Sequence, residues 1–99
     1  MIVKVIKIIN ANRQAGWGIV ERPPDSWIGR VGMITRPLIN WDGYWVIFYI
    51  KRGKKICEYK EVLHKDEFIE ATEKETKEFN KMQIEYVEQQ EAKMVAEKI

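Results

Sequence analysis

The strongest hydrophobic pattern of the chain lies in residues 44–50, where seven consecutive positions carry aromatic or branched apolar side chains. This composition favours a β-strand. Side chains alternate between the two faces of a strand, so this strand is apolar on both, whereas a strand at the surface of a simple sheet has one polar face. Leaving such side chains in water forgoes about 25 cal/mol per Å² of apolar area. We therefore expect the second face, formed by Trp45, Ile47 and Tyr49, to be covered by another element or by a partner.

Shorter segments on either side have the composition of further strands. Residues 2–9 are rich in Ile and Val, and residues 30–36 form a second candidate that ends at Pro37. Residues 55–59 return as the partner of the central strand, because Gly53 suits the left-handed position of a short hairpin turn.

The connecting segments are predicted from residues that form turns. We expect a loop over Asn10–Gly18 and no helix interior at Pro23–Ser26. Asp42-Gly43 is a strong signal for a turn with positive φ. Two short segments complete the pattern: a single turn at residues 62–64, and a strand or a helix at residues 67–71.

The C-terminal segment has the clearest helical signal. Thr72 and Glu75 fit a capping box, in which each side chain satisfies a free backbone amide of the other residue. We predict one amphipathic helix over residues 73–97, roughly 39 Å long at 1.5 Å per residue, whose last turns protrude, fray or meet another chain. Its apolar stripe consists of Phe79, Met82 and Tyr86, with Val87, Met94 and Val95 near its line.

Composition limits the class of protein. The 99 residues are 45% hydrophobic and 32% charged, as in an ordinary globular domain. No uncharged apolar run reaches the roughly 20 residues of a membrane span. We expect no signal peptide, because Lys4 and Lys7 interrupt the apolar N-terminus and no small-residue cleavage site follows. The single Cys57 has no partner for an internal disulfide. These features predict a small, soluble, cytoplasmic domain with no membrane partner.

Residues that usually carry catalysis or metals are scarce. His64 is the sole histidine, and together with Cys57 it falls short of the about four ligands of common zinc sites. His64 has no orienting carboxylate beyond its neighbour Asp66, and Cys57 on a hairpin strand is typical of a small core residue. The chain has no phosphate-binding loop, dinucleotide glycine pattern or nucleophile elbow. We therefore predict no enzymatic activity, no catalytic residues, no metal and no cofactor.

The net charge of +2 is unevenly distributed. Residues 1–65 carry twelve Lys and Arg against five acids, whereas residues 66–99 carry five Lys against ten acids. A basic body with an acidic tail is one of the asymmetries that point to a polyanionic partner. Charged faces that simply contact solvent are the alternative explanation.

The order of these motifs resembles the small SH3-like β-barrels of the KOW and related types. In that family a strand with a glycine among hydrophobic residues, here Arg30–Ile34, precedes a Gly-x-Trp/Tyr-Val-x-Phe strand, here within residues 43–50. A short helical turn then precedes the closing strand, here Glu67–Glu70. The resemblance implies a mainly β fold, with a five-stranded barrel over residues 2–71 and an added C-terminal amphipathic α-helix over residues 72–99.

Two binding functions follow from these patterns. The first is that of a non-catalytic interaction module, a small accessory or regulatory protein that binds a protein partner or self-associates through the C-terminal helix. Its candidate residues are the surplus apolar positions Trp45, Ile47, Tyr49, Phe79, Met82 and Tyr86.

The second function is binding of RNA or single-stranded DNA, because basic side chains neutralise phosphates and aromatic rings stack on bases. Its candidate residues are Lys51, Arg52, Lys54 and Lys55 in one hairpin turn, together with Trp17, Trp41 and Tyr44. The two functions differ in salt dependence, which is steep for phosphate binding.

Overall fold

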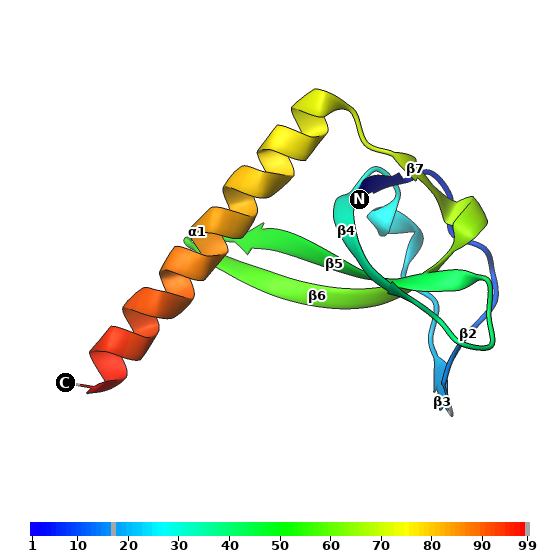
Figure 1. Cartoon of the computed structure of the whole chain (residues 1–99), viewed down its shortest axis with the longest axis horizontal. Helices are drawn as coiled ribbons and strands as arrows, with labels where there is room; N and C mark the ends of the chain where they lie inside the picture. The colour runs from blue at the N-terminus through cyan, green and yellow to red at the C-terminus, as the bar shows by residue number, and fades with distance from the viewer. Residues whose placement is uncertain (17, 99) are drawn as a thin grey trace.

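The structure of the protein, a computed structural model, describes residues 1–16 and 18–98. Five strands form one antiparallel sheet in the order β6-β5-β4-β1-β7, and a two-stranded hairpin, β2-β3, projects beside it (Figure 1). One long helix follows the last strand. The strands are β1 (Ile2–Val5), β2 (Arg13–Ala15), β3 (Gly18–Val20), β4 (Val31–Pro37), β5 (Gly43–Arg52), β6 (Lys55–His64) and β7 (Phe68–Glu70); the helices are η1 (Asp25–Trp27), η2 (Lys65–Glu67) and α1 (Glu73–Lys98).

The mainly β class, the five-stranded sheet and the long C-terminal helix confirm the prediction at this level. The predicted closure into a barrel is not seen. The strand order is linear, and no ladder joins β6 to β7 in the described part of the chain. Strands β5 and β6 are long and curved, so the open sheet bends around its core (Figure 1).

The core lies on the inner face of this curved sheet. Trp27, the last residue of η1, packs edge-on against Phe48 at 4.9 Å between ring centroids and against Tyr59 at 5.8 Å. The segment after β3 therefore closes the core with an aromatic side chain. The buried members of the core cluster are Val3, Val5, Trp27, Val46, Phe48 and Leu63.

This packing explains why residue 32 is a glycine. A Cβ atom at Gly32 would lie 2.7 Å from Val46 Cγ1, 2.8 Å from Phe48 Cε1 and 2.9 Å from the Ile47 carbonyl oxygen. Such distances are below van der Waals contact, so only glycine lets β4 lie against β5 with both buried side chains in place.

Several element boundaries differ from the prediction, and strand β2 (Arg13–Ala15) lies within the predicted loop over Asn10–Gly18. Strand β1 ends at Val5 rather than at residue 9, because the Ile6 N–H donates to the Glu67 carbonyl beside η2 at 2.8 Å and leaves the ladder with β4. Residues 62–64 continue β6 instead of forming a turn. The turn follows as η2, and residues 68–70 are a strand.

The two glycines in turns behave differently. Gly53 has φ of +64°, which confirms the predicted left-handed position in the β5-β6 turn. The positive φ predicted for Asp42-Gly43 is wrong, because Gly43 begins β5 with ordinary strand geometry. Glycine is needed there for contact: an added Cβ would overlap the Trp41 ring and come within 2.7 Å of the Leu63 carbonyl oxygen.

A buried ion pair joins the start of β2 to η2. Arg13 and Glu67 are 1% and 0% exposed, and the guanidinium nitrogens lie 2.5 and 2.6 Å from the two carboxylate oxygens. Arg13 also donates to the Val62 carbonyl at 3.1 Å, and Glu67 accepts from the N–H groups of Ile9 and His64. The pair is therefore well supplied with hydrogen bonds, which is the condition under which buried charges are tolerated.

The same pair predicts acid sensitivity. Burial alone would raise the pKa of Glu67, but hydrogen bonds from Arg13 and from the N–H groups of His64 and Ile9 lower it below the ordinary value of 4.5. The folded-state pKa is depressed, so this contribution to stability is complete above about pH 4.5 and is lost as pH falls through the folded-state value. Urea unfolding midpoints measured from pH 7 downwards should fall in this acid range, and the fall should be smaller in Glu67→Gln. Equal pH profiles in the two proteins would contradict the assignment.

Helix α1 begins as predicted. The Thr72 N–H donates to Glu75 Oε1 at 3.0 Å, and the Glu75 N–H donates to Thr72 Oγ1 at 3.2 Å, which confirms the capping box. The helix contacts the sheet as far as Gln89, and the turns after this residue extend beyond the sheet (Figure 1). This extension agrees with the length estimated from the sequence.

Helix α1 carries two apolar faces. Phe79, Met82 and Tyr86 point towards the sheet, as predicted. At 3.6 residues per turn, Ile84 and Val95 lie on the opposite side of the helix, and Val87 and Met94 lie about a quarter turn from the first stripe. The prediction that Val87, Met94 and Val95 lie near the line of the first stripe is therefore wrong. The set of these four residues, 48% to 60% exposed, is called the solvent stripe and consists of Ile84, Val87, Met94 and Val95.

Candidate protein-binding face

The side of β4, β5 and β6 that points away from the core is called the outer face. Because alternate residues of β5 fill the core, Trp45, Ile47 and Tyr49 point to the outer face. The cross-strand register adds Lys60 of β6 and Met33 of β4, which lie opposite Ile47 on its two sides. The outer face is therefore a continuous surface across three strands.

Helix α1 covers one end of the outer face. The Tyr49 ring lies 5.5 Å from the Phe79 ring and 5.0 Å from the Tyr86 ring, and Phe79 is buried by the contact. The expectation that the C-terminal helix shelters the second face of the central strand is confirmed at this end. Three predicted protein-binding residues, Tyr49, Phe79 and Tyr86, therefore already contact one another within the chain.

The contact extends to the outermost strand of the sheet. The Ile56 N–H donates to Gln89 Oε1 at 2.9 Å, and Gln89 Nε2 donates to the Ile56 carbonyl at 3.0 Å. In the sequence, Gln89 interrupts the apolar stripe. In the structure, its amide continues the helix–sheet contact by pairing with backbone groups of β6 that no strand occupies.

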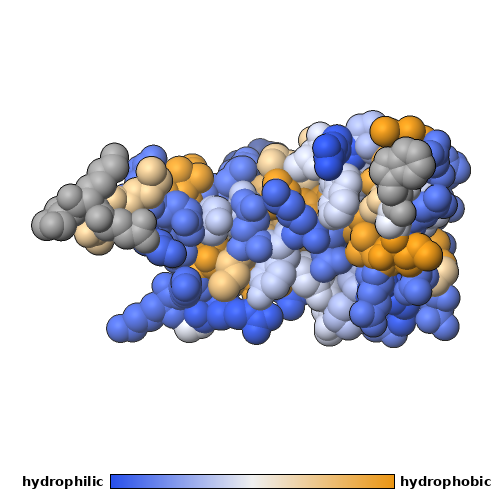
Figure 2. All heavy atoms as spheres, turned by 90° about the horizontal axis from the view of Figure 1, so that it is seen from below, coloured by the Kyte–Doolittle hydropathy of each residue, from blue (hydrophilic) through white to orange (hydrophobic). Residues whose placement is uncertain are grey.

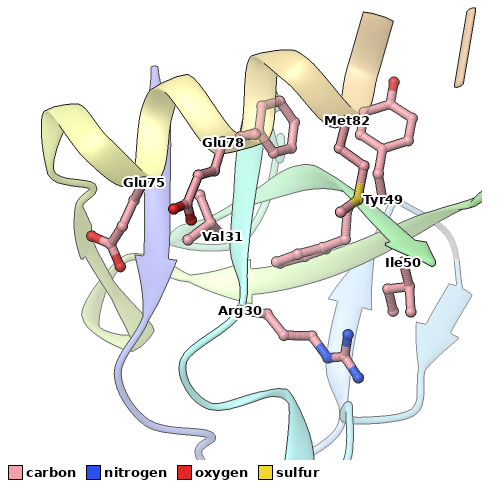
Figure 3. Close-up of a pocket in the computed structure, with 9 residues that line it drawn as sticks. Arg30, Val31, Tyr49, Ile50, Glu75, Glu78 and Met82 are labelled. Atoms are coloured by element: carbon pink, nitrogen blue, oxygen red, sulfur yellow. The ribbon is translucent and has the colours of Figure 1, made fainter. Parts of the chain in front are cut away.

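A small hollow remains where α1 crosses the sheet. Its volume is about 210 Å³, smaller than the roughly 300–1,000 Å³ of most small-molecule sites. Glu75 and Glu78 line it from α1, and Arg30 lines it from the segment just before β4 (Figure 3). Glu75 is already paired with Lys4 at 3.2 Å, and the Arg30 guanidinium lies 5.0 Å from the Trp27 ring centre. We interpret this hollow as a gap in the packing between α1 and the sheet.

Helix α1 does not reach the other end of the outer face, which the β2-β3 hairpin borders. Trp45 and Ile47 are half-buried and line a hollow of about 400 Å³, with Arg36 and Lys60 at its sides. The Thr35 hydroxyl also lines it and donates to the Trp45 carbonyl at 3.1 Å. This surface is called the uncovered patch and consists of Thr35, Arg36, Trp45, Ile47 and Lys60.

The uncovered patch continues towards the β2-β3 hairpin. A second hollow of about 300 Å³ shares Arg36 and Trp45 with the first and reaches Leu38, Ile39 and the hairpin residue Ala15. Ile39 is 91% exposed. Figure 2 shows hydrophobic residues gathered at this end of the molecule, away from the free end of α1. An apolar surface bordered by basic side chains therefore extends from β5 to the hairpin.

Sequence reasoning missed the basic members of this patch. The sequence predicts that the partner strand of β5 ends at residue 59, so this prediction does not include Lys60 in the sheet. Arg36 lies just past an irregularity in the β4-β5 register between Ile34 and Arg36, which the sequence does not reveal. The available signal for Lys60 was its spacing from Gly53, because a hairpin with known turn geometry fixes which residues face each other.

The predicted nucleic-acid residues do not form one site. Lys51, Arg52, Lys54 and Lys55 are exposed together at the β5-β6 turn. Trp41 and Tyr44 lie near the other end of β5, roughly 23 Å away along the strand at about 3.3 Å per residue. Tyr44 packs on Phe68 at 5.8 Å beside the core, and Trp41 packs on His64 at 5.2 Å. Trp17 lies outside the described residues.

His64 and Cys57 have structural surroundings. His64 Nδ1 accepts from the Asp66 N–H at 3.1 Å and thereby caps η2. Cys57 is half-buried in β6, opposite the core-facing Ile50. Sequence reasoning did not anticipate the cap, although a polar residue before a short helical turn is its usual signal.

Three further findings concern the class of protein. No helix in residues 1–16 and 18–98 is long and apolar enough to cross a bilayer. Within the same residues, no group of three or more His, Cys, Asp and Glu side chains could hold a metal ion. No family model, no curated protein and no solved structure matches the chain.

Proposed function

We propose that the protein is a non-catalytic binding module that docks a protein partner on the uncovered patch. The observation that carries this proposal is the unequal cover of the outer face. One end requires Phe79 and Tyr86 of α1 to shelter Tyr49, whereas Trp45 and Ile47 at the other end line an open hollow. Half-buried aromatic side chains in such a hollow are the usual anchors of protein interfaces.

An SH3-like arrangement is part of the same proposal. Its support is the order of elements: a hairpin within the long first loop, three consecutive antiparallel strands, a single helical turn at η2 and a short last strand beside β1. Binding modules of this kind present loops and one sheet face to a partner, which agrees with the position of the uncovered patch.

The decisive variant is Trp45→Ala. Removing this anchor should weaken partner binding by about 2 kcal/mol or more, or at least about 30-fold, because buried aromatic anchors dominate interface energies. Proteins captured from a nuclease-treated extract of the native host on the immobilised chain should be identified, purified and titrated against both chains. Ile69→Ser removes an exposed apolar residue from β7, outside the uncovered patch, and is the control.

A partner bound equally well by wild type and Trp45→Ala would contradict the proposal. Arg36→Glu serves as a second variant, because this exposed side chain can be reversed without disturbing the core. It should also weaken binding if the partner contacts the basic border of the patch.

Nucleic-acid binding is the second candidate function. The observation that favours it is the cluster of four exposed basic side chains at the β5-β6 turn: Lys51, Arg52, Lys54 and Lys55. Reversing all four charges should abolish binding of a single-stranded oligonucleotide, and the wild-type affinity should fall steeply with salt. Affinity that does not depend on salt would exclude this function for the turn.

A further inference from the structure

The solvent stripe of α1 is an apolar surface that its own sheet cannot cover. Phe79 and Tyr86 hold the helix against Tyr49 with the opposite side facing outwards. Ile84 therefore points away from the sheet and Val87 to the side, and both are exposed although they lie on turns that are docked. Among residues 1–16 and 18–98, one chain thus has two apolar surfaces that no described element covers, the solvent stripe and the uncovered patch.

The two surfaces have opposite charges. At 3.6 residues per turn, Glu88 and Glu91 lie along the solvent stripe, and both are exposed. The uncovered patch is bordered by Arg36 and Lys60, also exposed. Opposite charges around apolar centres orient two surfaces and exclude the wrong partners. This complementarity exists between copies of the chain, because the solvent stripe of a docked helix faces away from its own sheet.

We infer that the partner at the uncovered patch is a second copy of this chain, whose α1 lays its solvent stripe on Trp45 and Ile47. The exchange is mutual: each helix packs on its own sheet through one side and on the other chain's sheet through the opposite side. Two helices then lie side by side between two sheets, and the contact closes as a symmetric dimer. This inference rests on the proposed function and names its partner.

The spacing on the outer face fits a second helix. Along β5, the distance from Tyr49 to the midpoint of Ile47 and Trp45 is roughly 10 Å at about 3.3 Å per residue. Packed helices lie about 8–10 Å apart. Because α1 crosses β5 and β6 steeply (Figure 1), a neighbouring helix at this distance lies over the uncovered patch and beside the docked helix.

Direct pairing of two solvent stripes is less favourable. It would bring Glu88 and Glu91 of one helix towards the same residues of the other, and like charges at an interface are repulsive. The uncovered patch instead offers Arg36 and Lys60 to the same carboxylates.

The test is a charge exchange in the full-length chain. Sedimentation equilibrium over a wide concentration range should show a monomer–dimer equilibrium for the wild type. The patch variant Arg36→Glu/Lys60→Glu and the helix variant Glu88→Lys/Glu91→Lys should each raise the dimer dissociation constant at least about tenfold. An equimolar mixture of the two variants should restore dimerisation, because each contact in the mixed dimer again joins opposite charges. Lys7→Glu, an exposed reversal outside both surfaces, is the control.

Three outcomes overturn the inference. A chain that stays monomeric at all concentrations has no such dimer. A dimer that the patch variant leaves unchanged forms through the helices alone, and a mixture that fails to restore dimerisation shows that the two surfaces do not meet. The proposed function is tested independently of the dimer. A monomeric chain that still binds another protein through Trp45 would contradict the dimer but would agree with the proposed function.

Discussion

Arg13→Met is expected to lower the free energy of unfolding by about 3–5 kcal/mol, because it leaves the buried Glu67 carboxylate without its counter-ion. Domains of this size are stable by only about 5–15 kcal/mol. The variant should therefore unfold at much lower urea concentrations, or fail to fold at 37 °C. Urea titration followed by tryptophan fluorescence at pH 7 measures the change.

The double variant Arg13→Met/Glu67→Gln separates charge from packing. It removes both charges and keeps one side-chain oxygen, which can accept from the N–H of Ile9 or of His64 but not from both, because these two groups bind different carboxylate oxygens of Glu67. It should be more stable than Arg13→Met alone, because no unpaired charge stays buried. If Arg13→Met lies within about 1 kcal/mol of the wild type, the ion pair has no major role in stability.

Phe79→Ala is expected to release α1 from the sheet. Phe79 is the buried aromatic residue of the helix, and truncation of a buried Phe costs about 3–5 kcal/mol. A helix of this composition is marginally stable when isolated in water, so its backbone should lose most of its protection once the contact is weakened. Hydrogen exchange read by mass spectrometry reports this for residues 73–96 separately from the sheet.

Asn80→Ala is the matched control, because it changes the next residue of the same helix at an exposed position. It should leave exchange rates in α1 nearly unchanged. If Phe79→Ala also preserves slow exchange in α1, the helix is held by contacts other than Tyr49, and the account of how the outer face is sheltered is wrong.

The sequence predicted those parts of the fold that depend on local pattern. A strand with two apolar faces, the left-handed Gly53 and the capping box at Thr72 all follow from residues close together in the chain, and all are present. The Arg13–Glu67 pair could not be foreseen in this way. The two residues are 54 positions apart, each lies in a short polar segment, and the pattern gives no sign that the chain brings them together.

The candidate site was predicted in part for the same reason. Trp45 and Ile47 were identified because a two-faced strand needs cover, and this depends on one segment alone. Which end α1 would shelter depends on its crossing angle and on the Gln89 contact with Ile56, and neither is encoded by the apolar stripe. The positions of Arg36 and Lys60 at the border of the patch depend on the strand register. One wrongly predicted strand end is enough to change that register.

The side-chain amide of Gln89 occupies the place where another strand would bind Ile56, by offering one donor and one acceptor to the margin of the sheet. A free margin of this kind recruits extended segments of other molecules and grows into fibrillar aggregates. The docked helix therefore prevents strands of other molecules from pairing with this edge of the sheet. Loss of the last three turns of α1, which include Gln89, would expose this margin to any unfolded chain nearby, even if the rest of the domain stayed folded.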